Sequence, residues 1–350
     1  PGDGLCATAE GLCTLRAAVQ EANALHGPQR VALGAGVYLL NISDAPFAPA
    51  VQPTPEDDAV TGDLDIKADL ILVGLDADRT VIHANQGDRV FEVHGAVTVV
   101  LEKLTLTGGA PIDEGDGGGL HNNGGNVTLR QVSVTGNRAG SGGGVANRTG
   151  ALTVIDSSLT TNTTVEGGGG GGIHNEAVLT LQNVTLSGNG AGSGGAILAQ
   201  AGNATLTNVT VYGNSATGAG GGINGNSEAI QLSNTILAGN SASIGPDCGA
   251  SIRSNGHNLI GELRDCSILG ETGSNIAGQS PGVDLLAPNE RTTFSHGVLP
   301  TSRAIDTGSC ELANDQRGVE RPQGNGCDIG AIEYGGVVLA NTLYLPVVHR

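Results

Sequence analysis

The chain has 350 residues, of which 59 are glycine, and its aromatic side chains are limited to four Tyr and three Phe. Glycine does not recur at every third position, which excludes collagen, and no apolar run approaches the roughly 20 residues of a membrane span. The formal net charge is −18, from 34 acidic and 16 basic side chains. We therefore expect neither nucleic acid nor an anionic membrane surface as a partner.

The first predicted element is a short amphipathic helix over residues 14–25. Its apolar residues fall at helical spacing, and Thr14 stands where an N-cap is needed; the apolar positions are Leu15, Ala18, Val19 and Ala22. We expect residues 1–27 to form an N-terminal cap in which this helix covers an open end of the fold. Residues 44–62 are rich in proline and acidic residues, which predicts an excursion from an early coil.

A repeat of about 25 residues organises the middle of the chain. Each unit closes at a turn position, occupied in successive units by Asn137, Asn162, Asn189, Asn214 and Asn240. The residues three, eight and ten positions earlier are apolar, which predicts two short strands with one face inward. Between these strands lies a second polar column of Gln131, Asp156, Asn183, Asn208 and Asn234. We interpret both columns as structural turns, because Asn tolerates left-handed geometry and can pair with the same amide one coil away.

A third strand opens each unit after a run of glycines, at Leu120, Val145, Ile173, Ile197 and Ile223. Three strands per coil, stacked about 4.8 Å apart, predict an all-β fold, a single-stranded right-handed parallel β-helix. We expect it to span residues 28–334, with regular coils at about 90–245 and looser, disulfide-bearing coils at 246–334. A leucine-rich repeat is the main alternative, but glycine-rich segments do not form the helices that it needs.

Six cysteines fall into three local pairs without zinc-knuckle spacing. We predict the disulfides Cys6–Cys13, Cys248–Cys266 and Cys310–Cys327, which fit an oxidising compartment. Because the chain begins at Pro1, we interpret it as an exported protein whose signal peptide has been removed.

The C-terminal residues 335–350 form the most apolar stretch of the chain. They follow Gly335 and Gly336 and are rich in strand-forming residues, among them Val337, Leu339, Leu343, Leu345 and Val347. Such a segment either folds back on its own coils or adds as a strand to a neighbouring copy, which would give a head-to-tail filament.

Motifs at both ends and in the repeat resemble those of known families. Residues 12–24, LCTLRAAVQEANA, resemble the N-terminal motif of CSLREA-domain proteins. The run Gly194-Gly195-Ala196-Ile197 is similar to the repeats of polymorphic outer membrane proteins. The C-terminal motifs, at 304–306, 315–318 and 327–333, resemble a choice-of-anchor Q domain. The resemblance covers nearly the whole chain and implies an exported bacterial surface protein with a parallel β-helix fold, without implying a biochemical activity.

No catalytic or metal-binding residue is predicted. Arg130, Arg138 and Arg148 fall in different columns, and we expect no face to gather Asp, Arg and His. His121 and His174 occupy equivalent positions about two coils apart, roughly 10 Å, which is too far for one ion. We therefore expect no cofactor, with Ca²⁺ at the acidic loops Asp63–Asp65 and Asp113–Asp116 as the weak alternative.

These patterns favour a non-enzymatic extracellular surface protein, a rigid β-helix rod for display or self-assembly with copies of itself. The alternatives are a secreted polysaccharide lyase or hydrolase and a cell-surface adhesin. Clustered Asp and Arg on adjacent coils would favour the enzyme. Glycan modification is also an open alternative, with sequons at Asn41, Asn126, Asn147, Asn162, Asn183, Asn203 and Asn208.

Overall fold

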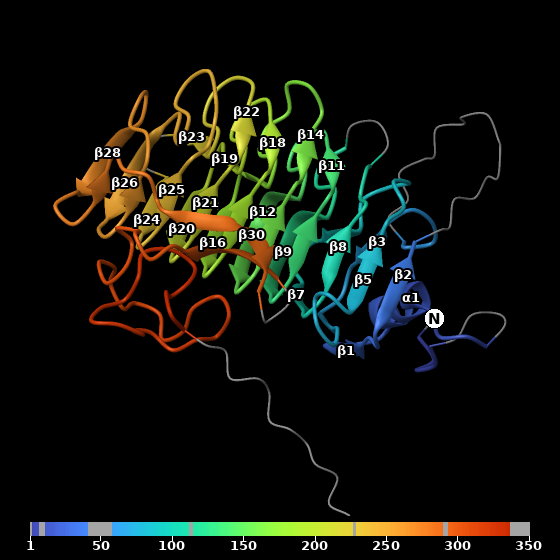
Figure 1. The fold of residues 1–350 in the computed structure, drawn as a ribbon. Coiled ribbons are helices and arrows are strands. Elements are labelled where there is room, and N and C mark those ends of the chain that lie inside the picture. The colour runs from blue at the N-terminus through green and yellow to red at the C-terminus, as the bar shows by residue number, and fades with distance from the viewer. Residues whose placement is uncertain are drawn as a thin grey trace, which may run out of the picture.

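The computed structural model describes residues 2–6, 11–40, 58–111, 115–226, 229–289 and 293–336. In this part of the chain the fold is a parallel β-helix, as predicted, preceded by one helix (Figure 1). Successive coils pair in register, so that Val134 lies between Leu106 of the preceding coil and Leu159 of the next. Among the described residues, no helix has the length and apolar character needed to span a membrane.

The strands form two long parallel sheets and a short one. The first sheet has one column of β1 (Gln29–Ala32), β4 (Leu70–Val73), β7 (Thr98–Glu102), β9 (Leu120–Arg130), β12 (Val145–Ile155), β16 (Val178–Gln182), β20 (Asn203–Thr207), β24 (Ile230–Ser233), β26 (Ser251–Asn255) and β28 (Ser267–Glu271). Its second column contains β3 (Leu64–Ile66), β6 (Phe91–His94), β15 (Ile173–Asn175), β19 (Ile197–Ala199) and β23 (Ile223–Gly225). The long strands β9 and β12 belong to both columns and join them.

The second long sheet forms another face of the coil. It runs through β2 (Gly36–Leu39), β5 (Thr80–His83), β8 (Thr105–Thr107), β10 (Ser133–Thr135), β13 (Ser158–Thr160), β17 (Thr185–Ser187), β21 (Thr210–Tyr212), β25 (Ile236–Ala238), β27 (Leu259–Ile260) and β29 (Ile276–Ala277). The short sheet contains β11 (Arg138–Ala139), β14 (Thr163–Thr164), β18 (Gly190–Ala191) and β22 (Ser215–Ala216).

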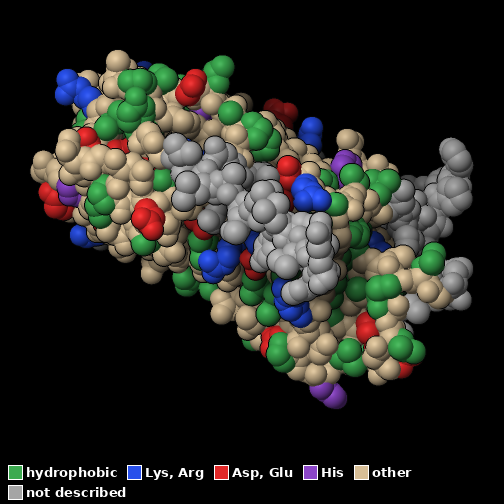
Figure 2. Space-filling model, turned by 60° about the horizontal axis from the view of Figure 1, so that its bottom comes forward, with side chains coloured by type: hydrophobic (Ala, Val, Ile, Leu, Met, Phe, Trp, Pro, Cys, Tyr) green, Lys and Arg blue, Asp and Glu red, His purple; other side chains and the backbone are tan. Residues whose placement is uncertain are grey.

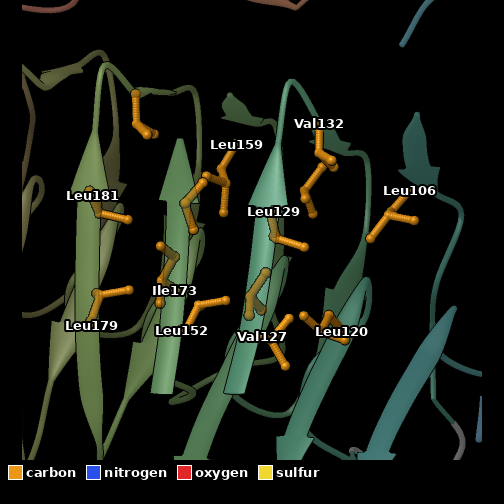
Figure 3. Close-up of a cluster of buried hydrophobic side chains, with 14 of the residues drawn as sticks. Leu106, Leu120, Val127, Leu129, Val132, Leu152, Leu159, Ile173, Leu179 and Leu181 are labelled. Atoms are coloured by element: carbon orange, nitrogen blue, oxygen red, sulfur yellow. The ribbon is translucent and has the colours of Figure 1, made fainter. Parts of the chain in front are cut away.

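The core is a stack of aliphatic side chains inside the coils. Val127 and Leu129 of one coil pair in register with Leu152 and Val154 of the next, and all four are fully buried. Figure 3 shows these layers, in which side chains from neighbouring strands point into the same interior space. Because each coil can bury its apolar face only against its neighbours, the stack as a whole is the folding unit.

A ladder of buried asparagines connects the coils along their axis. The Nδ2 of Asn137 donates to Oδ1 of Asn162 at 3.0 Å, and the same bond links Asn162 to Asn189. The ladder continues through Asn214 to Asn240, whose Nδ2 donates to Asp247 Oδ1 at 2.9 Å. Each amide also satisfies backbone groups, so these closing turns are structural, as the repeat suggested.

A second ladder lies at the third strand of the coils. Asn122 donates to Asn147 at 2.8 Å, and Asn147 donates to Asn175 at 2.7 Å. All three side chains are fully buried. The column ends at Ala199, where Asn175 donates instead to the carbonyl of Ala201.

The turn column between the first two strands is left-handed, as expected. Its φ angles are between 50° and 55° at Gln131, Asp156, Asn183, Asn208 and Asn234. The partners, however, are not only the same residues one coil away. Asn183 and Asn234 donate to the carbonyls of Asn314 and Asp328, both at 3.0 Å. This column therefore holds the C-terminal part of the chain against the coils.

The N-terminal cap contains α1 (Leu15–Ala24), and Thr14 is its N-cap, accepting from the Ala17 amide. Leu15, Val19 and Ala22 pack into the same core as Leu64 and Ile66 of β3. The helix thus covers the apolar interior at this end, as the sequence indicated.

The coils end earlier than the expected residue 334. β28 and β29 are the last paired coil strands in the described residues, and they are followed by the antiparallel pair β30 (Val283–Pro288) and β31 (Phe294–Val298). Residues 304–334, which we call the return segment, then run back along the outside of the second long sheet (Figure 1). The physical reason is that the motif residues of this segment pair with each other. The side chains of Arg321 and Glu333 are 0% and 1% exposed, and Arg321 Nη1 lies 2.5 Å from Glu333 Oε1 in an ion pair.

On the face shown in Figure 2, acidic and basic side chains of the described residues are intermixed with neutral ones. The acidic side chains of the described residues do not form one continuous patch on this face.

Candidate functional site

Charged and histidine side chains line one strand column of the first sheet. Asp65 of β3 pairs in register with Glu92 of β6, and Glu92 pairs with His121 of β9. Two further coils place Ala146 and His174 in the same row. We call the following set the charged strip: Asp65, Arg89, Glu92, His94, Asp116, His121, Arg148, His174 and Glu176.

The expectation that no face gathers Asp, Arg and His was therefore wrong. Asp65 and Arg89 lie before the regular repeat, whereas His121, Arg148 and His174 lie on strands of the regular coils. Only the register of parallel pairing, which places residues 27 or 29 positions apart beside each other, brings them together.

Asp65, Glu92, His94 and His121 lie at the N-terminal end of the strip. His94 Nε2 lies 2.8 Å from Asp65 Oδ1 and 3.9 Å from Glu92 Oε1. On the other side of Glu92, the same Oε1 atom lies 3.2 Å from His121 Nδ1. The ligand atoms of Asp65, Glu92 and His94 all lie within 4.8 Å of one another.

Each carboxylate in this group is fixed through its other oxygen. The Ala59 amide donates to Asp65 Oδ2 at 2.8 Å, and Arg89 forms an ion pair with Glu92 Oε2. Asp65 Oδ1 and Glu92 Oε1 are thereby left facing the imidazoles.

Burial controls the protonation of this end of the strip. Desolvation, followed by the positive charge of Arg89, lowers the pKa of His121 to about 4. Burial, followed by repulsion from Asp88, raises the pKa of neighbouring Asp63 to about 8. Perturbed groups of this kind are typical of functional sites, although structural ion pairs also produce them.

Arg16 of the N-terminal motif holds the loop that leads into this end of the strip. Its guanidinium donates to the carbonyls of Ala59 at 3.0 Å and of Asp63 at 2.7 Å. It also donates to those of Thr61 and Gly62. This residue was predicted only as part of a helix, yet it positions the Ala59 amide that binds Asp65.

The other end of the strip centres on Arg148. Its Nε donates to Asp116 Oδ2 at 2.9 Å, and its Nη1 pairs with Glu176. His174 Nε2 lies 3.1 Å from Gln200 Oε1, and burial lowers the His174 pKa. Ala146 separates His121 from His174 in register, as the spacing predicted, so these two imidazoles do not adjoin each other.

The acidic loops considered for Ca²⁺ differ in outcome. Asp63 and Asp65 are buried, and Asp65 is engaged by Ala59 and His94. Asp113 and Glu114 lie outside the described residues, and Asp116 pairs with Arg148. Asp65 and Asp116 thus have amide or basic partners, and Asp63 Oδ2 lies 3.4 Å from Arg89 Nη1.

The structure has three disulfides, between Cys6 and Cys13, Cys248 and Cys266, and Cys310 and Cys327. These are the local pairs that the spacing suggested, and they lie outside the regular coils. The residues of the apolar tail, Val337, Leu339, Leu343, Leu345 and Val347, lie outside the described residues.

The sequons differ in accessibility. Asn147, Asn162 and Asn208 are fully buried, and Asn183 is 5% exposed. Asn126 and Asn203 are the exposed sequons of the described residues, whereas Asn41 lies outside them. A glycan on the folded protein would therefore have to be at an exposed position such as Asn126 or Asn203.

An open depression of about 430 Å³ lies beside the start of α1. It is lined by Cys13, Thr14, Leu15, Arg16, Tyr38, Leu39 and Leu40. It is separate from the strip residues and contains mostly apolar surface.

Comparisons with protein-family models, with curated proteins and with solved structures found no match to this chain.

Proposed function

We propose that the protein is a non-enzymatic extracellular structural protein, a rigid β-helix rod for display or self-assembly. The observation that carries this proposal is the pair of buried amide ladders, which link successive coils by direct hydrogen bonds. A satisfied polar network of this kind rigidifies a fold and specifies its register. The disulfides support an oxidising, extracellular location. The resemblance to CSLREA-domain and choice-of-anchor Q proteins agrees with surface export.

The burial of the N-terminal end of the charged strip also favours a structural role over catalysis. Asp65 has a side chain 1% exposed, and those of Glu92 and His121 are 12% and 16% exposed. A polysaccharide needs an open groove in which its sugar rings reach the acid and base. Here the carboxylates face protein groups instead.

Self-assembly is supported by the edge strand β2. This strand is the first of the second long sheet, and among the described residues its one neighbouring strand is β5. Its Val37 and Leu39 side chains are 66% and 46% exposed. An exposed apolar edge strand is a template for strand addition from another copy.

Negative-stain microscopy of native material tests this proposal. We expect filaments or sheets, and we expect Val37→Lys to shorten or abolish them because a lysine on an edge opposes pairing. The matched control is Val178→Lys, a valine 51% exposed on β16 in the interior of a sheet, which should leave assembly unchanged. Single rods at all concentrations, or equal loss of assembly in both variants, would argue against self-assembly through β2.

A secreted polysaccharide lyase or hydrolase is the second candidate, favoured by the gathering of Asp65, Arg89, Glu92 and His94 on adjacent coils. Under this alternative, purified protein would cleave acidic or neutral polysaccharides, and Glu92→Gln would abolish cleavage. Depolymerisation that Glu92→Gln removes would replace the structural proposal.

A further inference from the structure

We propose that the N-terminal end of the charged strip is a binding site for a divalent transition-metal ion of the Zn²⁺ type. The ligands are Asp65 Oδ1, Glu92 Oε1 and His94 Nε2, which all lie within 4.8 Å of one another, and His121 Nδ1 borders the site beside Glu92. This inference is independent of the proposed structural role, since a bound ion could lock the first coils of a rod or serve in chemistry.

The spacing of the ligand atoms fits tetrahedral coordination. Bonds of about 2.0–2.1 Å to nitrogen and oxygen place neighbouring ligand atoms about 3.3 Å apart. The structure has 2.8 Å between Asp65 Oδ1 and His94 Nε2 and 3.9 Å between Glu92 Oε1 and His94 Nε2, and all three ligand atoms lie within 4.8 Å of one another. Three protein ligands leave the fourth position of a tetrahedral site to water or to His121, whose Nδ1 lies 3.2 Å from Glu92 Oε1.

A second, independent observation is that the imidazole of His121 lacks hydrogen-bond partners. Both ring nitrogens of His121 are inaccessible to solvent and have no hydrogen-bond partner. A buried polar group normally finds a partner, and leaving one unpaired costs about 1–3 kcal/mol. Nδ1 nevertheless lies within 3.2 Å of the Glu92 oxygen that also faces His94. A metal ion between these groups would satisfy it.

The donors are held from behind, as metal ligands usually are. Ala59 fixes Asp65, Arg89 fixes Glu92, and the three ligands project from the paired strands β3 and β6. Such outer contacts orient ligands and raise metal affinity. Because the N-terminal cap places Ala59 through Arg16, the site also depends on the cap.

The donor chemistry selects the class of ion. One imidazole with two carboxylates suits Zn²⁺ and related first-row ions, whereas Ca²⁺ requires six to eight oxygen ligands. The site therefore differs from the calcium loops considered from the acidic sequence.

The test uses the full chain with its disulfides intact, after chelation and dialysis. Titration with Zn²⁺ in a calorimeter should show one site, and Co²⁺ should give the visible absorption of a tetrahedral complex. His94→Gln and Glu92→Gln should each weaken Zn²⁺ binding by at least about 100-fold, since the loss of even an outer contact costs 10–100-fold.

His174→Gln is the control, because His174 lies in the same row as Glu92 and His121, is more buried than His94 and is separated from the site by Ala146. This variant should bind Zn²⁺ as the parent does, and all variants should keep the parent's circular dichroism. Absence of stoichiometric binding by the parent chain, or binding that His94→Gln and Glu92→Gln leave unchanged, would overturn the proposal. Loss of filaments with metal binding retained would count against the structural role alone.

Discussion

At the scale of single residues, the buried amides of the two ladders hold the coils together, because each bonds to protein groups of a neighbouring coil. Asn208 shows how many groups depend on one side chain. In the amide orientation that satisfies its neighbours, its oxygen accepts from Asn234 Nδ2 at 2.6 Å and from both Nη atoms of Arg321 at 3.2 Å. It is fully buried, at the contact between the coils and the return segment.

We predict that Asn208→Ala lowers the free energy of unfolding by about 1–3 kcal/mol, because it leaves buried donors unpaired. Chemical denaturation measures the change. Asn203→Ala, at an exposed strand position, should change stability by less than about 0.5 kcal/mol. Equal effects of both substitutions would contradict the structural role of the turn column.

The buried imidazole of His296 makes the stability of the fold depend on pH. Its Nδ1 lies 2.7 Å from the Asp284 carbonyl and its Nε2 lies 2.9 Å from Ser187 Oγ, and burial lowers its pKa. The unfolded chain has the ordinary histidine pKa of about 6.5 and takes up the proton first. Stability contributed by neutral His296 is therefore present above pH 6.5 and is lost as the pH falls below it.

We predict that the melting temperature declines between about pH 7 and pH 5, and that His296→Gln makes this decline shallower. The control is His26→Gln. Because His26 is exposed, this substitution should leave the pH dependence of the melting temperature unchanged. Thermal unfolding followed by circular dichroism at several pH values decides the outcome. Parallel profiles for the parent and His296→Gln would show that His296 does not contribute.

At the scale of elements, the return segment is attached through buried polar groups, in addition to the apolar contacts of Ala304 and Ile329 with the coils. Gln316 accepts from Thr185 Oγ1 at 2.7 Å, and the Ala331 amide donates to Thr210 Oγ1 at 3.1 Å. Arg321 donates to the carbonyls of Asp328 and Gly330 and pairs with Glu333. One guanidinium thus joins three positions in the C-terminal half of the segment.

We predict that Arg321→Met lowers stability by about 3–5 kcal/mol, because Glu333 then stays buried without its counter-ion. The return segment should also become accessible, as faster proteolysis or amide exchange within residues 304–334 would show. Arg79→Met removes an exposed pair with Asp76 and should cost at most about 1 kcal/mol. If the return segment in Arg321→Met is as well protected from proteolysis and amide exchange as in the parent, Arg321 does not hold this segment in place.

The elements that sequence could predict are those in which local pattern and packing coincide. Apolar residues at fixed positions in each coil identify the strands, and Thr14 identifies the start of α1. The return segment could not be predicted in the same way. Its contacts join residues such as Asn183 and Asn314, 131 positions apart, and no local period reports them. The convergence of Asp65, Glu92 and His94 had the same cause, because pairing register alone makes them neighbours.

At the scale of the whole molecule, the two ends of the rod differ. α1 covers the core at the first coils, but β2 leaves an apolar edge beside it. Residues 337–350 lie outside the described residues, and the chain reaches them from Gly336, whose carbonyl accepts from Arg317. If the apolar tail of one copy adds to β2 of the next, the contact is head-to-tail, and an open filament results unless the rotation closes a ring.

Deletion of residues 337–350 tests this idea and retains the contact at Gly336. If the tail is a donor strand, the truncated protein should lose polymers and keep its melting temperature, because its own coils are intact. Addition of a synthetic peptide of residues 337–350 should then occupy β2 of the truncated protein, and Val37→Lys should abolish that binding. Light scattering, microscopy and thermal unfolding follow these outcomes. Unchanged assembly with a lower melting temperature would instead assign the tail to its own coils, since an internal strand stabilises the copy that carries it.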